Sequence, residues 1–235
     1  MTKPLSFITT YYNQYNMLAK QISLWQNYSD DVKEQTKFVL IDDGSLKRAC
    51  RVEHLIEDTA IDISVYRIHE DIYCNIPGAV NLGATVCGTD WMFKHDIDHL
   101  VPEESIVKML ELTKIKNVQD KVYKFYRHNG TEISNPNKIA PGQFMIQVKD
   151  FWKIGGWDED FCGHYGQNDP AFFWRSKGII ETEERYDINM IIDSDGETPS
   201  IDRKDREHNI NLFEEKKRTG NWSDEFLRFD WERVY

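Results

Sequence analysis

The stretch Trp91-Met92-Phe93-Lys94-His95-Asp96-Ile97-Asp98-His99-Leu100 lies near the middle of the chain and determines how the rest is interpreted. Residues 91–94 are typical of the end of a buried strand, and Asp96 and Asp98 follow at once. In an extended segment residues i and i+2 point the same way, so both carboxylates can face one point. Two carboxylates that face each other repel unless a proton or a cation lies between them. The stretch therefore predicts a divalent metal site for a phosphate-bearing ligand, with a solvated strand end as the alternative.

The composition indicates a folded and acidic protein. Of 235 residues, 40% are hydrophobic and 13% are aromatic, which is enough for a substantial core and argues against disorder. The formal net charge of −11 argues against a nucleic-acid partner, because neutralising phosphates needs a basic face. An acidic protein that binds a diphosphate must overcome repulsion, and a cation between its carboxylates and the phosphates does so.

The sequence predicts a soluble, cytoplasmic protein. Residues 1–5 lack a basic region followed by an apolar run, so no secretory signal is expected. No apolar run approaches the ~20 residues that span a bilayer, so no transmembrane segment is expected either. The cysteines have no Cys-x-x-Cys spacing, which argues against a zinc site and a disulfide framework and favours free thiols. They are Cys50, Cys74, Cys87 and Cys162.

Strands and helices are predicted to alternate in the first part of the chain. The expected strands are residues 5–10, 37–41, 61–68 and 91–94, and the expected helices are residues 15–25, 48–57 and 77–86. Such alternation is typical of a parallel α/β sheet with right-handed crossovers, in which ligands bind beyond the carboxyl ends of the strands. Polar segments follow the predicted strands at residues 9–13, 42–45 and 95–99. These segments are expected to converge on one cleft.

The remainder, residues 101–235, is predicted to be a smaller α+β part. A helix is expected at 103–114, strands at 122–126 and 144–148 with a hairpin turn at Asn129-Gly130, and a short helix from Asp150. A further helix at 171–177 would have Asp169 as its N-cap and Pro170 at N1. A mobile loop at 193–206 and a final helix at 208–218 complete the prediction. No linker separates the halves, so we expect one domain, 1–235, with lobes 1–100 and 101–235.

Several motifs in this order resemble a known family. They are Asp42-Asp43-Gly44-Ser45, Asn81-Leu82-Gly83, Asp96-Ile97-Asp98, and Gly155-Gly156-Trp157-Asp158-Glu159 followed by Asn168-Asp169. Together, over Leu5 to Lys177, they resemble a family 2 type glycosyltransferase of the GT-A fold. They are also similar to metal-dependent galactosyltransferase and chondroitin-polymerase-type domains. The resemblance implies a mostly parallel sheet flanked by helices, and metal-dependent, inverting transfer of a hexose from a UDP-sugar to a glycan or other hydroxyl acceptor.

The resemblance also implies which residues bind the donor. The first lobe would hold the nucleotide sugar, and the second would hold the acceptor and a C-terminal lid. The expected donor-binding residues are Thr9, Tyr11, Asp42, Asp43, Asn75, Asn81 and Asp96. Either Asp42 or Asp43 would accept a hydrogen bond from the base or ribose, with a turn-forming Asp-Gly as the alternative for Asp43. Asn81 could equally be a polar residue that packs the helix.

A metal, Mn²⁺ or Mg²⁺, is expected to bridge the protein and the diphosphate. The resemblance implies Asp98 as its direct ligand and His208, in the C-terminal segment, as a further ligand. His95, His99 and His164 compete with His208, because a lone histidine is not usually a ligand. Positive side chains in the lid, at Arg203, Lys204 and Arg206, could cover the diphosphate, or could belong to a solvated loop.

Asp169 is the expected general base. Direct displacement at the anomeric carbon needs a carboxylate to take the proton of the attacking hydroxyl, and a helix N-terminus keeps a carboxylate ionised. The alternative is a plain N-cap. The family usually has Glu before the base, whereas this chain has Asn168, which puts the acceptor preference in doubt. Trp157, Tyr165 and Asn168 are the expected acceptor-binding residues, Trp157 and Tyr165 together with His164 forming an aromatic wall.

Two other functions fit parts of the sequence. A sugar nucleotidyltransferase would need a Gly-rich basic loop after the first strand, but residues 9–13 read Thr-Thr-Tyr-Tyr-Asn, which disfavours it. A catalytically degenerate domain that binds a nucleotide sugar is the other alternative, because the fold alone does not decide function.

Overall fold

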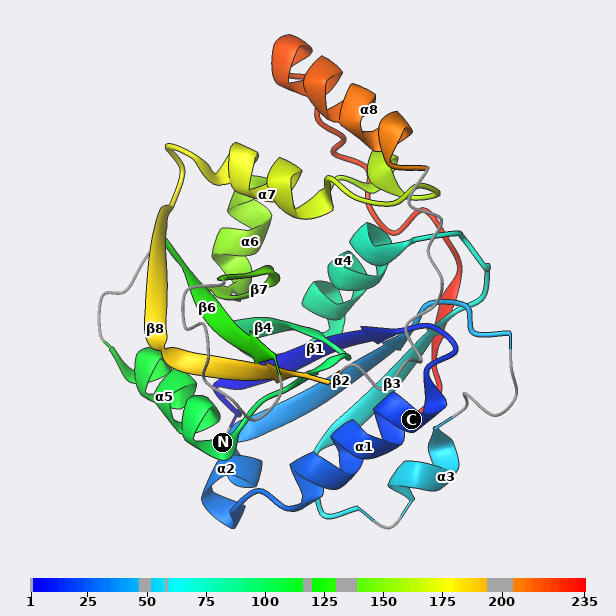
Figure 1. Ribbon diagram of the computed structural model, residues 1–235. Coiled ribbons are helices and arrows are strands. Elements are labelled where there is room, and N and C mark those ends of the chain that lie inside the picture. Colours follow the sequence, from blue (N-terminus) through cyan, green and yellow to red (C-terminus); the bar gives the residue numbers. More distant parts are fainter. Residues whose placement is uncertain (1, 47–51, 58, 116–119, 130–138, 194–204) are drawn as a thin grey trace.

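The computed structural model describes residues 2–46, 52–57, 59–115, 120–129, 139–193 and 205–235. At its centre nine strands of these residues form one sheet in the order β5-β8-β6-β7-β4-β1-β2-β3-β9 (Figure 1). The strands are β1 (Leu5–Tyr11), β2 (Thr36–Asp42), β3 (Ile63–Ile68), β4 (Trp91–Asp96), β5 (His99–Leu100), β6 (Lys121–Asn129), β7 (Ile139–Gln147), β8 (Glu181–Ile192) and β9 (Trp231–Arg233).

The middle of the sheet is parallel. β3, β2, β1 and β4 are parallel neighbours, and β6 is parallel to β8. β7 lies between β4 and β6 and is antiparallel to both, so β6 and β8 run in the same direction as β1 to β4. The edge strands β5 and β9 are antiparallel to their neighbours. The predicted α/β fold, with a mostly parallel central sheet flanked by helices, is confirmed. The sheet also continues across residue 100, since β7 pairs with β4.

Helices cover both faces of the sheet (Figure 1). The helices of the described residues are α1 (Tyr15–Gln26), α2 (Asp30–Gln35), α3 (Glu53–Ile56), α4 (Ile76–Val86), α5 (Glu103–Lys114), α6 (Val148–Ile154), the 3-10 helix η2 (Glu159–Phe161), α7 (Asn168–Ser176) and α8 (Arg206–Thr219). α1, α2, α3 and α5 pack on one face, and α4, α6 and α7 pack on the other. Among these helices none is long and apolar enough to cross a membrane.

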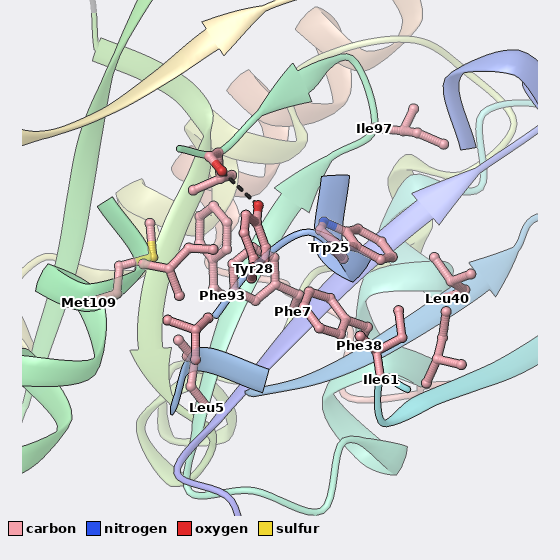
Figure 2. Close-up of a cluster of buried hydrophobic side chains, with 14 of the residues drawn as sticks. Leu5, Phe7, Trp25, Tyr28, Phe38, Leu40, Ile61, Phe93, Ile97 and Met109 are labelled. Carbon is pink, nitrogen blue, oxygen red and sulfur yellow. Dashed lines mark hydrogen bonds between the residues drawn. The ribbon is translucent and has the colours of Figure 1, made fainter. Parts of the chain in front are cut away.

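The core on the α1 face follows from helical periodicity. Leu18, Ile22 and Trp25 recur at the spacing of one helix face, and all three are buried against the sheet. Trp25 stacks on Phe38 of β2 with ring centroids 4.4 Å apart, beside Phe7 of β1 (Figure 2). Each such burial contributes roughly 1.5–3 kcal/mol, so this face of the sheet is strongly specified.

On the opposite face, α4 approaches the sheet closely because its residues are small. A Cβ at Gly83 would lie only 2.1 Å from Cγ2 of Ile8 on β1, so a larger residue here would push the helix away. Pro77 lies in the first turn of α4, as predicted. Asn75, just before α4, lies beside Asp43, which follows the carboxyl end of β2.

The structure differs from the sequence prediction in several elements. α7 begins at Asn168 with Gln167 as its N-cap, so Asp169 is not the cap. The amide of Ala171 donates to the carbonyl of Gln167, and the helix starts two residues earlier than expected. The helix expected at 48–57 appears as α3, with residues 48–51 outside the described part. The Gly130 turn, most of the loop at 193–206, and Arg203 and Lys204 also lie outside it. β8 and β9 were not predicted.

Candidate functional site

The acidic stretch forms a turn at the carboxyl end of the parallel strands. β4 ends at Asp96, Ile97 and Asp98 form the turn, and His99 begins β5. One potential ligand atom from each of Asp96, Asp98 and His99 lies within 4.8 Å of the others. The two carboxylates therefore lie close together, as expected from the sequence. A turn, rather than the alternation of an extended strand, brings them there.

Buried polar contacts hold this turn in place. His95 Nε2 and Gln21 Nε2 both donate to the carbonyl oxygen of His99, at 2.6 Å and 2.8 Å. Because His95 Nε2 carries the proton, its Nδ1 accepts from the Thr9 hydroxyl at 2.9 Å. Burial lowers the pKa of His95 to about 4, which keeps the ring neutral. Thr9, which was expected to line the donor pocket, is itself buried and supports the turn through His95.

His99 is a candidate ligand that the sequence did not separate from its competitors. Its Nδ1 lies 2.7 Å from Oδ1 of Asp98, and its Nε2 is buried with no hydrogen-bond partner among the described residues. The signal in the sequence is its position directly after the Asp-x-Asp. Two carboxylates and one imidazole suit a divalent cation such as Mn²⁺, and the buried, unpartnered nitrogen leaves the ring with coordinating capacity that the fold does not use. The residues present therefore fit the predicted metal.

A glycine on β7 brings the predicted base to the same place. A Cβ at Gly142 would lie 3.1 Å from Asp96 Oδ2, 3.1 Å from Lys94 Nζ and 3.4 Å from Asp169 Oδ2. These three charged groups therefore surround one point, although they come from β4 and from α7. Lys94 also forms an ion pair with Asp96. The sequence placed Asp96 and Asp169 in one cleft, but did not identify Lys94 as the cation between them.

The charges of this cluster shift one another's ionisation. Burial opposes the charged form of Asp96, but Lys94 and the neighbouring histidines outweigh it and lower the pKa of Asp96. Burial likewise opposes the charge of Lys94, and Asp96 and Asp169 together still raise the pKa of this lysine. Burial raises the pKa of Asp169, with Asp96 adding to the effect and Lys94 acting against it. Asp169 is thus the carboxylate of the cluster that accepts a proton most readily.

Asp169 does not serve the helix that carries it. No side-chain hydrogen bond caps α7, and Asp169 Oδ1 is buried without a hydrogen-bond partner among the described residues. The Oδ1 atom of the preceding Asn168 is likewise buried without a hydrogen-bond partner among the described residues. The capping role that was the alternative for Asp169 therefore finds no support in these contacts. A buried, unpartnered carboxylate oxygen is costly unless a ligand uses it.

The two aspartates after β2 lie in different environments. Asp42 is fully buried, and its carboxylate accepts from Arg67 Nε and from the amide of Ser45, both at 2.9 Å. Asp43 has an unpartnered Oδ1, and burial raises its pKa to about 8, with Asn75 acting in the opposite direction. The amide of Asp43 donates to the carbonyl of the buried Tyr11. Asp43 and Asn75 are therefore neighbours just beyond the carboxyl end of β2, whereas Asp42 organises the turn.

Asn81 and Trp157 are parts of the core. Asn81 Nδ2 donates to the carbonyl of Trp157 and to Glu159, both at 2.8 Å, and its Oδ1 accepts from the Trp157 amide at 2.9 Å. These contacts correspond to the packing alternative for Asn81, and they join α4 to the Gly-rich loop. Trp157 is 2% exposed, and its ring lies 5.4 Å from the Lys94 ammonium. Trp157 thus covers the lysine from within the core.

His208 lies outside the group formed by Asp96, Asp98 and His99. Its ring stacks on that of His164 at 3.7 Å, and His164 Nδ1 lies 2.8 Å from Asp205. His208 lines a cavity of about 590 Å³ together with Asn75 and Phe229. His208 is not part of the group of possible ligands formed by the Asp-x-Asp turn and His99 among the described residues.

The loop that leads to Asp169 is anchored by α8. Asn209, buried on α8, donates to the carbonyls of Phe161, His164 and Gly166. The guanidinium of Arg206 lies 4.8 Å from the ring of Tyr165. Tyr165 is half-buried, unlike Trp157, and lies just before Asn168.

Comparison with solved structures identifies proteins of similar fold. The structure of TarS residues 1–349 from S. aureus has a TM-score of 0.65 and 12% identity, and the match covers 94% of this chain and 67% of that chain. The mannosyltransferase PcManGT from Pyrobaculum calidifontis, in complex with GDP-Man and Mn²⁺, has a TM-score of 0.68 and 12% identity over 95% of this chain and 66% of that chain. TarS 1–349 in complex with UDP-GlcNAc has a TM-score of 0.68 and 11% identity, covering 94% and 68%.

No protein-family model matches the sequence, and a comparison with curated protein sequences gives no match. At such identities the structural similarity concerns the fold, and this chain spans about two thirds of the chains that it matches.

Proposed function

We propose that this protein is a metal-dependent glycosyltransferase that moves a sugar from a nucleoside diphosphate donor, a UDP-sugar in the first instance, to a hydroxyl acceptor. The observation that carries the proposal is the convergence of Asp169 with Asp96 and Lys94 around Gly142, next to the Asp98–His99 pair. The position of this cluster, beyond the carboxyl ends of parallel strands, is where α/β sheets bind ligands. The similar folds of structures solved with UDP-GlcNAc and with GDP-Man and Mn²⁺ add support.

The donor would lie across the ends of β1, β2 and β4. Asp43 and Asn75 offer polar groups to the nucleoside, since both have unpartnered buried atoms at the cleft edge. Asp96 would contact the ribose or the donor sugar. The remaining predicted donor residues would act mainly by supporting the cleft. Thr9, Asp42 and Asn81 use their polar atoms in hydrogen bonds within the fold, and Tyr11 is buried in the core beneath them.

Asp98 and His99, with Asp96 beside them, would hold the cation. A bound Mn²⁺ or Mg²⁺ would supply Lewis-acid stabilisation of the leaving diphosphate. Lys94, held by Asp96 within the same cluster, adds a fixed positive charge where negative charge develops. His208 remains the alternative ligand that the family resemblance implies.

Asp169 would act as the general base of an inverting displacement. The acceptor oxygen forms a bond to the anomeric carbon, the bond from that carbon to the diphosphate oxygen breaks, and Asp169 takes the acceptor's proton. The carboxylate needs to be ionised before the reaction and basic enough to accept the proton. Lys94 favours ionisation, and burial makes the carboxylate a better base. Asn168, Tyr165 and, through its contact with Lys94, Trp157 would shape the acceptor side.

The test is an assay of sugar transfer and of donor hydrolysis over UDP-, GDP- and dTDP-sugars, with and without Mn²⁺. We expect turnover of one nucleotide sugar that depends on metal and is lost in Asp98→Ala. Asp169→Asn should retain donor binding, measured by thermal stabilisation, and lose transfer. Full transfer by Asp169→Asn would refute the assignment of the base. Stabilisation by a nucleotide sugar without turnover under any condition would instead favour the degenerate binding domain.

A further inference from the structure

Two lysines occupy one row of the sheet beside the predicted base. Lys94 on β4 and Lys124 on β6 are both register partners of Phe144 on β7, which lies between them. Both lysines act electrostatically on Asp169. Lys94 is paired with Asp96, whereas no carboxylate of the described residues forms an ion pair with Lys124. The two positions are thus matched in register and differ in whether a carboxylate of the described residues forms an ion pair with the lysine.

The environment of Lys124 disfavours its charge. Its side chain is half-buried, and burial lowers its pKa although Asp169 and Glu184 act against the shift. The ring of Phe173 lies 3.6 Å from the Lys124 ammonium and offsets part of the lost hydration through a cation–π contact. A ring supplies no full negative charge, so the lysine retains the capacity to bind one.

An aromatic pair begins two residues after Lys124 on β6. Tyr126 of β6 and Tyr186 of β8 stack with ring centroids 4.5 Å apart, and Tyr186 is 65% exposed. Their hydroxyls donate to the carboxylate of Glu184, at 2.8 Å and 3.3 Å, which orients that anion toward the tyrosines. One face of Tyr186 is covered by Tyr126 and much of the rest is open. An exposed, rigid aromatic face is suited to packing against the C–H surface of a sugar ring.

We propose that Lys124 and Tyr186 form an acceptor subsite for a carbohydrate that carries a carboxylate or a phosphate group. Lys124 binds the anionic group, and Tyr186 packs on the sugar ring that bears it or on the next ring. This inference rests on the proposed function, because Asp169 is the base that the acceptor hydroxyl would meet. It adds the class of acceptor, a negatively charged glycan.

The test is an NMR titration of the full chain with three matched sugars, in the absence of donor and metal. The probes are D-glucose, D-glucuronate and D-glucose 6-phosphate, which present a hydroxyl, a carboxylate and a phosphate at the same carbon. We expect at least one anionic probe to shift the amide signals of residues 124 and 186, with an affinity roughly tenfold or more above that of glucose. Which anion binds more tightly distinguishes a carboxylate from a phosphate acceptor.

Variants then attribute the preference to one side chain. Lys124→Met should remove the preference for the anion, Lys124→Arg should retain it, and Lys114→Met, on the exposed surface of α5, should leave it unchanged. Lys124→Gln replaces the Met variant if that protein does not fold. Equal affinity for the three sugars, or a preference that survives in Lys124→Met, overturns the proposal. Because the titration needs no turnover, it can fail while sugar transfer is observed, and it can succeed where no transfer is found.

Discussion

Gly142 lies directly against Asp169, so that a single methyl group on Gly142 would sit 3.4 Å from the carboxylate oxygen Oδ2. The same methyl group would lie 3.1 Å from Lys94 Nζ and from Asp96 Oδ2. Two of these distances are shorter than comfortable packing allows. The absence of a side chain at this one position of β7 is therefore what permits the charged groups to meet.

Gly142→Ala should reduce function more than stability. The added methyl group displaces Lys94 or Asp96, so we expect transfer to fall by roughly tenfold or more while the free energy of unfolding changes by about 1 kcal/mol or less. Urea denaturation and the transfer assay on the same preparation measure the two effects. Unchanged transfer by Gly142→Ala would show that transfer does not depend on the close contact of Asp169, Asp96 and Lys94.

Substitution of the two candidate histidines should separate their roles. His99→Ala should weaken Mn²⁺ binding by roughly 10–100-fold, because it removes either a ligand or the partner that orients Asp98. His208→Ala should leave Mn²⁺ affinity nearly unchanged, since His208 stacks on His164 outside the Asp-x-Asp group. Calorimetric titration with Mn²⁺, without donor, measures both. The reverse result would favour the ligand expected from the family resemblance.

Lys94→Met should move the pH dependence of transfer. Asp169 has a raised pKa through burial, and Lys94 acts to lower it. Transfer is lost as pH falls and Asp169 becomes protonated, so removing the lysine should shift this acidic limb to higher pH. The pH profile of kcat/KM for wild type, Lys94→Met and Lys94→Arg measures the shift. Lys94→Arg should restore part of the wild-type profile, whereas a purely structural role for Lys94 would lower activity at every pH alike.

Asp43→Asn should stabilise the protein at alkaline pH. Burial raises the pKa of folded Asp43 to about 8, above that of an unfolded chain, so the folded state holds a proton that the unfolded state releases. The unfolded state binds fewer protons between about pH 4 and pH 8, and stability therefore falls as pH rises through this window. The variant removes that loss, worth roughly 2–4 kcal/mol near pH 7. Denaturation of both proteins at pH 4 and pH 8 should show the difference only at pH 8.

The first part of the fold could be predicted because local patterns and packing agree there. The apolar spacing of Leu18, Ile22 and Trp25 and the small residues around Gly83 correspond to the faces that the structure buries. β8 could not be recognised, because its first residues, beginning at Glu181, are charged and largely exposed. It is a strand because β6 supplies its hydrogen bonds, which is a contact between distant segments that no local pattern encodes.

The sequence pointed to the acidic residues of the candidate site and not to its basic ones. Acidic pairs at strand ends leave a local signature, whereas Lys94 and Lys124 are ordinary strand lysines until the register aligns them with Phe144. The burial of Trp157 could not be predicted from the sequence either. An aromatic residue in a Gly-rich loop is usually accessible, but Asn81 binds both the amide and the carbonyl of Trp157 and draws the loop into the core.

The buried Glu159 joins this loop to residues near the end of the chain. Its carboxylate accepts from the amides of Leu227 and Arg228, and the following strand β9 pairs with β3. During synthesis, the segment that precedes Asp169 therefore lacks these partners until residues 227–233 have left the ribosome. Such late, non-local contacts slow folding. The candidate site should accordingly be one of the last parts of the molecule to reach its final geometry, and a chain interrupted before β9 should remain a target for quality-control proteases.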